Sequence, residues 1–322
     1  MKNKCLVIIL GHARASELTW KSFKSNVFDE LDADLALCVG ESDDNNDSNP
    51  YWKYAKYKWL SKEYENYADG YDVFQKKYGG TNNWRELLDL APDYVAPFLG
   101  GCYDEHHKPA ASAGILVYYR ALALEFITNL KLDNEYDRFL ITRSDFIWSD
   151  PHPKLNKLSP KFIWIAFGER YGGVTDRYAL LNNIDIFTYL DVLKPIVSDH
   201  VTLKSKLLKF DDKRRINMES YIKFHLMDKG IYNKVRFLPY YMFSVRDKDS
   251  PGRWSKGTFN KNFDCYIKYP DEKTMSDIYS KLFHGRGLLK SFKCYPYNVF
   301  IYYIVEFTAK VKRRLFKQRI EY

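Results

Sequence analysis

The sequence predicts an α/β fold in which a mixed or parallel sheet of Rossmann type is flanked by helices. Two observations carry this prediction. The first 50 residues contain an apolar run, an amphipathic segment and a second apolar run, which is the order strand, helix, strand. A helical pattern over residues 112–130 then precedes an apolar stretch over residues 136–148, so helices and strands continue to alternate. With 322 residues, the chain can bury a sizeable core.

The opening unit reads as strand, helix, strand and loop. The apolar run over residues 5–10 predicts a fully buried strand that ends in a turn at Gly11. Ser16 is expected to cap the helix that follows. Residues 33–40 predict a second buried strand, and the polar residues 41–50 predict a loop. This is the opening of a parallel, nucleotide-binding type of sheet.

The next two segments differ in how clearly their patterns predict secondary structure. Residues 51–108 are aromatic and charged, and we interpret them as a partly helical insertion over the edge of the sheet. Residues 112–130 are the clearest helix, with Ser112 as its cap. The apolar face expected for this helix consists of Ile115, Tyr119, Leu122, Phe126 and Leu130.

The second half of the chain is expected to mix short strands with helices. Residues 136–148 read as one strand and residues 161–167 as another. A glycine-rich loop from residue 168 is expected to run into a helix. Residues 217–230 predict an amphipathic helix that ends before Gly230, and a late strand follows over "VRFLPYYMFSVR". Residues 247–295 are polar and read as irregular.

The net charge of +9 is concentrated at the C-terminus. Residues 310–322 hold six basic residues and one acidic residue, so a nucleic-acid-binding body is not indicated. Residues 291–322 predict a basic amphipathic helix after a domain over residues 1–290. An apolar face beside lysine and arginine is typical of a helix on anionic lipid, so residues 296–322 are expected to contact a membrane surface. The alternative is a docked helix with a solvated basic end.

A cytoplasmic location, with peripheral attachment to a membrane, is the expectation. The five cysteines are scattered and show no C-x-x-C pair, which fits a reducing compartment. The first apolar run is too short for a signal peptide. No window offers the roughly 20 apolar residues that a membrane-spanning helix needs.

Arg143 and Asp145 stand two positions apart after the apolar residues 139–141. A charge inside a buried strand is costly unless it is paired or bound to a metal. At the carboxyl end of a strand, the same side chains would face the crevice where open α/β sheets bind ligands. The alternative is a structural ion pair, because residues two apart on a strand point to one face.

Three further positions are candidates for chemistry. Arg14, in the turn after the first strand, could reach a phosphate or base, or simply face solvent. Asp176 could accept a proton from a ligand hydroxyl, and the alternative is the N-cap of a helix. Glu219 is either a second candidate base or a stabiliser of the helix dipole. The adjacent His106 and His107 have no visible metal-binding partners and are expected in a loop.

The chain resembles nucleotide-sugar-dependent glycosyltransferases of the GT-A fold over roughly residues 4–245. The order and spacing of five motifs carry the resemblance: "GHAR" at residues 11–14, "SAGILVYYRALAL", "YDRFLITRSD", "GGVTDR" and "NMESYIKFHL". Within that class, the chain is similar to bacterial and viral enzymes that build surface polysaccharides, including the lipopolysaccharide-synthesis type.

The resemblance implies a UDP- or GDP-linked sugar donor and a divalent metal ion. Asp145 would take the DxD position, where an aspartate binds Mn²⁺ or Mg²⁺ that bridges the diphosphate. Arg143 replaces the first acid of that motif and could contact phosphate directly. Asp150 is a second candidate ligand. The donor-binding set is Gly11, His12, Arg14, Arg143, Ser144 and Asp145.

The same resemblance implies a glycan acceptor on the other side of the site. Asp176 or Glu219 would be the catalytic residue. The acceptor-binding set is Gly172, Gly173, Arg177, His106 and His107.

The predicted function is the transfer of a sugar from a nucleotide diphosphate to a surface-glycan or lipid-linked acceptor. One alternative is a non-catalytic, membrane-associated protein that binds nucleotides or glycans on the same fold. The missing first acid of DxD and the basic tail motivate that alternative. A nucleotidyltransferase is a third option, but no lysine-containing glycine-rich loop follows the first strand. A Ser-His-Asp hydrolase has no G-x-S-x-G motif to support it.

Overall fold

The main sheet is mixed and mostly parallel. The computed structural model describes residues 4–80, 82–90, 98–108, 111–210, 216–249 and 257–284. Within these residues, seven strands form a sheet in the order β3-β2-β1-β4-β7-β6-β8. β7 is antiparallel to both of its neighbours, and the other adjacent pairs are parallel. The strands are β1 (Cys5–Gly11), β2 (Asp34–Gly40), β3 (Tyr57–Ser61), β4 (Arg138–Thr142), β6 (Ile163–Ala166), β7 (Ala179–Asn182) and β8 (Val235–Leu238).

A second, smaller sheet is antiparallel and lies beside the carboxyl end of β4. Its order in the described residues is β10-β11-β9-β5. Its strands are β5 (Phe146–Trp148), β9 (Met242–Arg246), β10 (Thr258–Asn260) and β11 (Cys265–Ile267). Residues 143–145 therefore join β4 of the main sheet to β5 of the small sheet.

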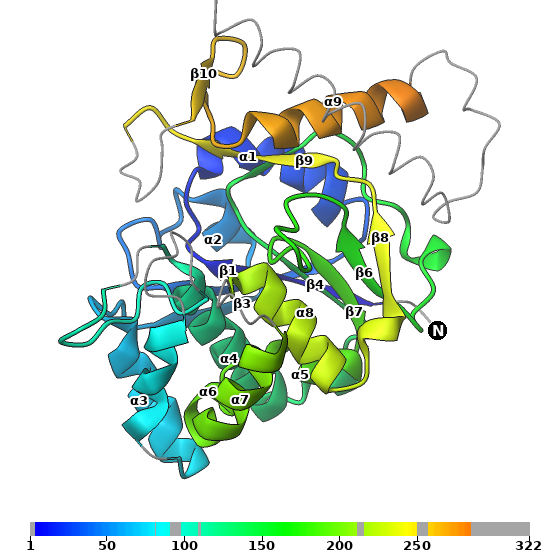
Figure 1. Ribbon diagram of the computed structural model, residues 1–322. Coiled ribbons are helices and arrows are strands. Elements are labelled where there is room, and N and C mark those ends of the chain that lie inside the picture. The colour runs from blue at the N-terminus through cyan, green and yellow to red at the C-terminus, as the bar shows by residue number, and fades with distance from the viewer. Residues whose placement is uncertain are drawn as a thin grey trace, which may run out of the picture.

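Helices cover both faces of the main sheet (Figure 1). The longer ones are α1 (Ser16–Phe23), α3 (Tyr67–Tyr78), α4 (Ala113–Asn129), α7 (His200–Phe210), α8 (Met218–Asp228) and α9 (Pro270–His284). The shorter ones are α2 (Pro50–Tyr54), α5 (Asp185–Leu190) and α6 (Lys194–Ser198). In Figure 1, helices α3 to α8 lie below the sheet, whereas α1, β9 and α9 lie above it. No helix of the described residues is long and apolar enough to cross a membrane.

The core divides into two layers because side chains alternate along each strand. In β1, Leu6 and Ile8 pack into the cluster beneath the sheet with residues of α4. Val7 and Ile9 pack into the opposite cluster with residues of α1 and α9. Every residue of β1 is buried, which is typical of a central parallel strand covered on both faces.

Four predicted elements match the structure closely. The first two strands are β1 and β2, and the helix predicted over residues 112–130 is α4. Asn217 caps α8 by accepting a hydrogen bond from the backbone N–H of Ser220, whose hydroxyl accepts one from the Asn217 N–H in return. Gly230 follows α8 with a φ of +70°, which fits its predicted place after the helix.

Several local predictions were wrong. The stretch over residues 136–148 is two strands in two sheets, because the chain turns at residues 143–145. Ser16 lies inside α1 rather than at its cap, which is Ala15 with a φ of 57°. Asp176 is not a helix cap, because the residues after it lead into the strand β7. Leu130, expected on the apolar face of α4, follows the end of this helix and is half exposed, whereas Arg120 of α4 is fully buried.

Two segments hold more regular structure than their composition indicated. The segment over residues 51–108 contributes β3, an edge strand of the main sheet, as well as α3. The segment over residues 247–295, expected to be irregular, contains β10, β11 and the 15-residue helix α9. The tail over residues 291–322, predicted to form a membrane-binding helix, lies outside the described residues.

Candidate active site

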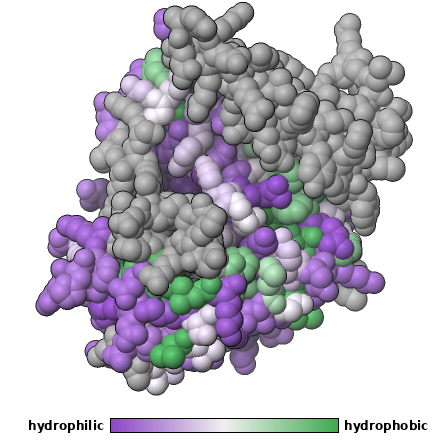
Figure 2. Space-filling view, viewed as in Figure 1, coloured by the Kyte–Doolittle hydropathy of each residue, from purple (hydrophilic) through white to green (hydrophobic). Residues whose placement is uncertain are grey.

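A cavity of about 510 Å³ opens at the carboxyl ends of β1 and β4. The turn after β1, the β4–β5 junction, the first turn of α4, and the ends of β9 and β11 line it. Figure 2 shows hydrophilic residues gathered around a recess in the upper half of the view. The charged residues that line the cavity are Arg14, Arg143, Arg246, Lys268, Glu63 and Asp145. Cations therefore outnumber carboxylates, which favours an anionic ligand.

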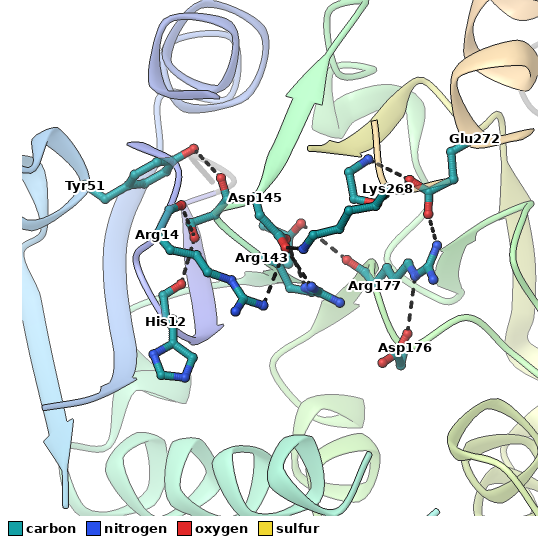
Figure 3. Close-up of polar contacts among 12 residues, drawn as sticks. His12, Arg14, Tyr51, Arg143, Asp145, Asp176, Arg177, Lys268 and Glu272 are labelled. Atoms are coloured by element: carbon teal, nitrogen blue, oxygen red, sulfur yellow. Dashed lines mark hydrogen bonds and ion pairs between the residues drawn. The ribbon is translucent and has the colours of Figure 1, made fainter. Parts of the chain in front are cut away.

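Asp145 lies at the centre of three cations (Figure 3). Arg143 donates to both of its carboxylate oxygens, with distances of 3.1 Å from Nε to Oδ1 and 2.8 Å from Nη2 to Oδ2. Lys268 donates to Oδ2 through its ammonium, and Arg14 Nη2 lies 3.7 Å from the same oxygen. Burial alone would raise the pKa of Asp145, but Arg143, Lys268 and Arg14 hold it well below its usual value.

Ser144 fixes the turn after β1 against the β4–β5 junction. Its hydroxyl donates to the carbonyl oxygens of His12 at 2.7 Å and of Arg14 at 3.0 Å. Its own carbonyl accepts from the buried hydroxyl of Tyr51 at 3.2 Å. Gly11, His12 and Arg14 all line the cavity, so the structure brings the donor-binding set predicted from the sequence to one place.

The groups around Asp145 do not fit a divalent cation. Mg²⁺ and Mn²⁺ are bound by several oxygen ligands. Here both oxygens of Asp145 already face cations, and no group of three or more carboxylate, histidine or cysteine residues that could hold a metal occurs within the described ranges. Asp150 accepts hydrogen bonds from Ser149 and Ser280 and is not among the residues that line the cavity. Unit charges about 4 Å apart interact by about 4 kcal/mol at an effective dielectric constant of 20, and a divalent ion would double that repulsion.

His12 and Glu63 also line the cavity. The Nε2 of His12 lies 3.7 Å from Oε1 of Glu63. Burial lowers the pKa of His12, while Glu63 opposes that shift. Glu63 also accepts hydrogen bonds from Tyr67 at 2.9 Å and Tyr119 at 2.7 Å, which fix its position at the cavity wall.

A second cluster of charges borders the cavity through Tyr269. This residue lines the cavity, and the guanidinium of Arg177 lies 4.6 Å from the centroid of its ring. Arg177 is buried and forms an ion pair with Glu272, whose other carboxylate oxygen accepts two hydrogen bonds from Ser244 at 2.6 Å. Asp176 lies 3.8 Å from Arg177, on the side opposite Glu272 in Figure 3.

Glu219 interacts electrostatically with Asp176 and Arg177 of this second cluster, and the pKa of its carboxyl is altered. We call Asp176, Glu219 and Glu272, together with Arg177, the acidic cluster. Burial, and then the neighbouring charge of Asp176, raise its pKa from 4.5 to about 8. Gly173 packs directly against the backbone of Glu219, because a Cβ at Gly173 would lie 1.9 Å from the Glu219 carbonyl oxygen. Val174 N–H donates to that same carbonyl at 3.0 Å. The glycine-rich loop is thus attached to the first turn of α8.

A second hollow, of about 340 Å³, adjoins the glycine-rich loop. It is lined in part by Gly172, Gly173, Tyr171 and Lys223. Its aromatic and polar walls offer apolar and hydrogen-bonding surface together. Gly173 in this lining contacts the backbone of Glu219, whereas Asp176, Arg177 and Glu219 are not among the residues that line either cavity.

Some predicted residues lie elsewhere, and some functional candidates were missed. His106 lines a separate surface hollow, and His107 pairs with Asp89 at 2.9 Å and Asp104 at 3.0 Å. Neither histidine lines the two cavities described above. Sequence reasoning missed Lys268, Arg246, Tyr269, Glu63 and Glu272. A signal existed only for Glu272, because Pro270 can start a helix and Met275, Ile278 and Tyr279 have helical spacing.

No protein-family model matches the chain, and no curated protein matches it in sequence. Solved structures do match, and one of them is the apo form of mouse xyloside xylosyltransferase 1. That match has 10% identity and a TM-score of 0.37, and it covers 73% of this chain and 85% of the other. Because the TM-score is low, the fold class rests on the observed strands and helices themselves. They confirm an α/β fold with a mixed, mostly parallel seven-stranded sheet flanked by helices.

Proposed function

We propose that this chain is a glycosyltransferase of GT-A-like fold that moves a sugar from a nucleotide diphosphate to a hydroxyl group of a glycan. One observation carries the proposal. A cavity lined by four cationic side chains at the carboxyl ends of β1 and β4 borders an acidic cluster in which Glu219 has a pKa of about 8. The first feature suits a diphosphate leaving group, and the second suits the deprotonation of an acceptor.

The donor is assigned to the 510 Å³ cavity, which is large enough for a nucleotide. Arg14 and Arg143 would contact the diphosphate, because planar guanidinium groups match phosphate geometry. The nucleoside, UDP- or GDP-linked in our proposal, would lie toward Glu63 and His12, where a carboxylate can accept hydrogen bonds from ribose hydroxyls.

The acceptor is assigned to the hollow beside Gly172 and Gly173. A hydroxyl of the acceptor would approach Glu219 or Asp176. The anionic carboxylate of that residue would take the hydroxyl proton as the new glycosidic bond forms. A base with a pKa near the working pH combines a useful ionised fraction with useful basicity. Surface glycans or lipid-linked sugars are the proposed acceptors, and a basic tail on an anionic membrane would bring the enzyme to the latter.

The test is turnover by the full chain with a panel of UDP- and GDP-sugars, followed as release of the nucleoside diphosphate. We expect the wild-type chain to cleave a sugar donor. Glu219→Gln should lower the rate of transfer to a glycan acceptor by about 10²–10⁴-fold, and nucleotide binding measured by calorimetry should be retained. Glu125→Gln is the matched control, because Glu125 lies on α4 and pairs with Lys77 away from the cavity. Binding without any turnover would favour the non-catalytic alternative. The absence of both would refute the proposal.

A further inference from the structure

The cations around the large cavity come from four separate places in the chain. Arg14 follows β1, Arg143 follows β4, Arg246 ends β9 and Lys268 follows β11. The last two belong to the small sheet, whose pairing β11–β9–β5 places them opposite the main-sheet residues. Four positive groups from separate parts of the chain thus line one cavity.

Arg143, Arg14 and Lys268 keep hydrogen-bonding capacity for a ligand. Arg143 uses Nε and Nη2 for Asp145, and a guanidinium has five N–H groups in total. The contact from Arg14 to Asp145 is 3.7 Å, which is an ion pair without a hydrogen bond. An ammonium has three N–H donors, and Lys268 directs one to Asp145.

Asp145 holds three of these cations close together. It is only 2% exposed, and its two oxygens face Arg143, Lys268 and Arg14. The first turn of α4 also lines the cavity through Ser112, Ile115 and Leu116. The amino end of that 17-residue helix adds positive potential to the same space.

We infer that this cavity binds the diphosphate of the donor through Arg14, Arg143, Arg246 and Lys268, without a divalent metal ion. The identity of the ligand as a nucleotide diphosphate rests on the proposed function. During transfer, the bond between the sugar carbon and the diphosphate oxygen breaks, and its electron pair stays with the diphosphate. The acceptor oxygen forms the new bond to that carbon, and its proton passes to the acidic cluster. The cations neutralise the charge that the departing diphosphate gains.

The experiment is calorimetric binding of inorganic pyrophosphate, UDP and GDP to the full chain, in EDTA and in Mn²⁺. We expect binding in EDTA, and equal or weaker binding in Mn²⁺, because that ion complexes the phosphates in solution. Binding that appears only with Mn²⁺, or that tightens about tenfold or more with it, would overturn the inference and leave the proposed function standing.

Two variants test which side chains bind the anion. Arg14→Met and Arg246→Met should each weaken pyrophosphate binding about tenfold or more in EDTA. Arg14 has a side chain that is 45% exposed, so its replacement spares the core and a folding defect is not expected. Lys248→Met is the matched control, because Lys248 pairs with Asp264 on the surface and does not line the cavity. Equal binding by Arg14→Met, Arg246→Met and the wild-type chain would overturn the assignment of the anion to this cavity.

The outcomes of these binding measurements also distinguish this inference from the proposed function. If pyrophosphate and at least one of the two nucleotides each bind in EDTA, both the inference and the proposed function are supported. Metal-free binding of pyrophosphate alone supports the anion site and contradicts the nucleotide-sugar assignment. Failure of all three probes in both buffers overturns the inference and the proposed function together.

Discussion

Glu219 shows how the surroundings of one side chain change its chemistry. Its position in the first turn of α8 would suit an ordinary ionised carboxylate, which stabilises the helix dipole. Burial and the neighbouring Asp176 instead raise its pKa to about 8. A buried carboxylate with a raised pKa is a frequent participant in proton transfer. The free-energy cost of ionising the buried Glu219 raises its pKa, and this raised pKa suits Glu219 to its proposed role as a base.

Asp176→Asn separates the two candidate bases. Removing the charge of Asp176 should lower the pKa of Glu219, so the rising limb of the pH profile of kcat/KM should move toward lower pH. If Asp176 itself takes the proton, the rate should fall about 10²-fold or more at every pH tested. The measurement is initial rate against pH, with Glu125→Gln as control. An unchanged profile and rate would contradict a role for Asp176.

At the scale of secondary-structure elements, α9 joins the small sheet to the acidic cluster. Its Glu272 is fully buried, forms an ion pair with Arg177, and accepts hydrogen bonds from the backbone N–H and hydroxyl of Ser244 in β9. Removing one partner of a buried pair leaves a charge without compensation. The position of Arg177, and of Asp176 beside it, thus depends on a helix almost 100 residues later in the chain.

Glu272→Gln should lower the free energy of unfolding by about 3 kcal/mol, within the range for broken buried ion pairs. Asp277→Asn on the same helix is the matched control, because it breaks a partly exposed pair with Lys273 and should cost less than about 1 kcal/mol. Chemical denaturation of both variants provides the comparison. Equal stability of the two would mean that the pair between Glu272 and Arg177 does not hold α9 in place.

At the scale of the whole molecule, two sheets meet at the chain segment over residues 143–145. The main sheet supplies the turn after β1 and the end of β4, and the small sheet supplies Arg246 and Lys268. The carboxylate of Asp145 bridges cations from both sheets. The cavity is therefore a property of the packing between the sheets rather than of either one.

The stability of the whole molecule should depend on pH through Glu219. A folded pKa of about 8, above the ordinary 4.5, means that the folded chain binds this proton more tightly than the unfolded chain. The associated stability is fully present below pH 4.5 and is lost as the pH rises through about 8. Glu219→Gln should therefore be more stable than the wild type at pH 9, by on the order of 2–4 kcal/mol.

The comparison at low pH completes this test. At pH 5 the stability advantage of Glu219→Gln should largely disappear, because the wild-type side chain is then protonated. Thermal unfolding at both pH values gives the difference. A variant that is equally stable or less stable than the wild type at pH 9 would show that ionising Glu219 does not destabilise the folded chain.

How much of the molecule the sequence predicts depends on how local the cause is. The apolar runs of β1 and β2, the helix α4, and the helix α8 with Gly230 after it follow from patterns within a few residues, and these predictions are confirmed. The break between β4 and β5 was missed, because the polar residues between two apolar runs acquire their turn only from pairing with different sheets. The helix α9 was missed because its polar composition concealed its helical spacing.

By itself, the sequence determined the alternating α/β order and placed Arg14, Arg143 and Asp145 at the ends of strands, because hydrophobic periodicity and strand ends are local properties. Only the tertiary structure decided which charges meet there. Lys268 and Arg246 reach Asp145's cavity through the pairing of β11, β9 and β5, and Glu272 reaches Arg177 through the docking of α9. A motif that resembles a metal site in sequence becomes a group of cations in space, because contacts between residues more than 100 positions apart determine its net charge.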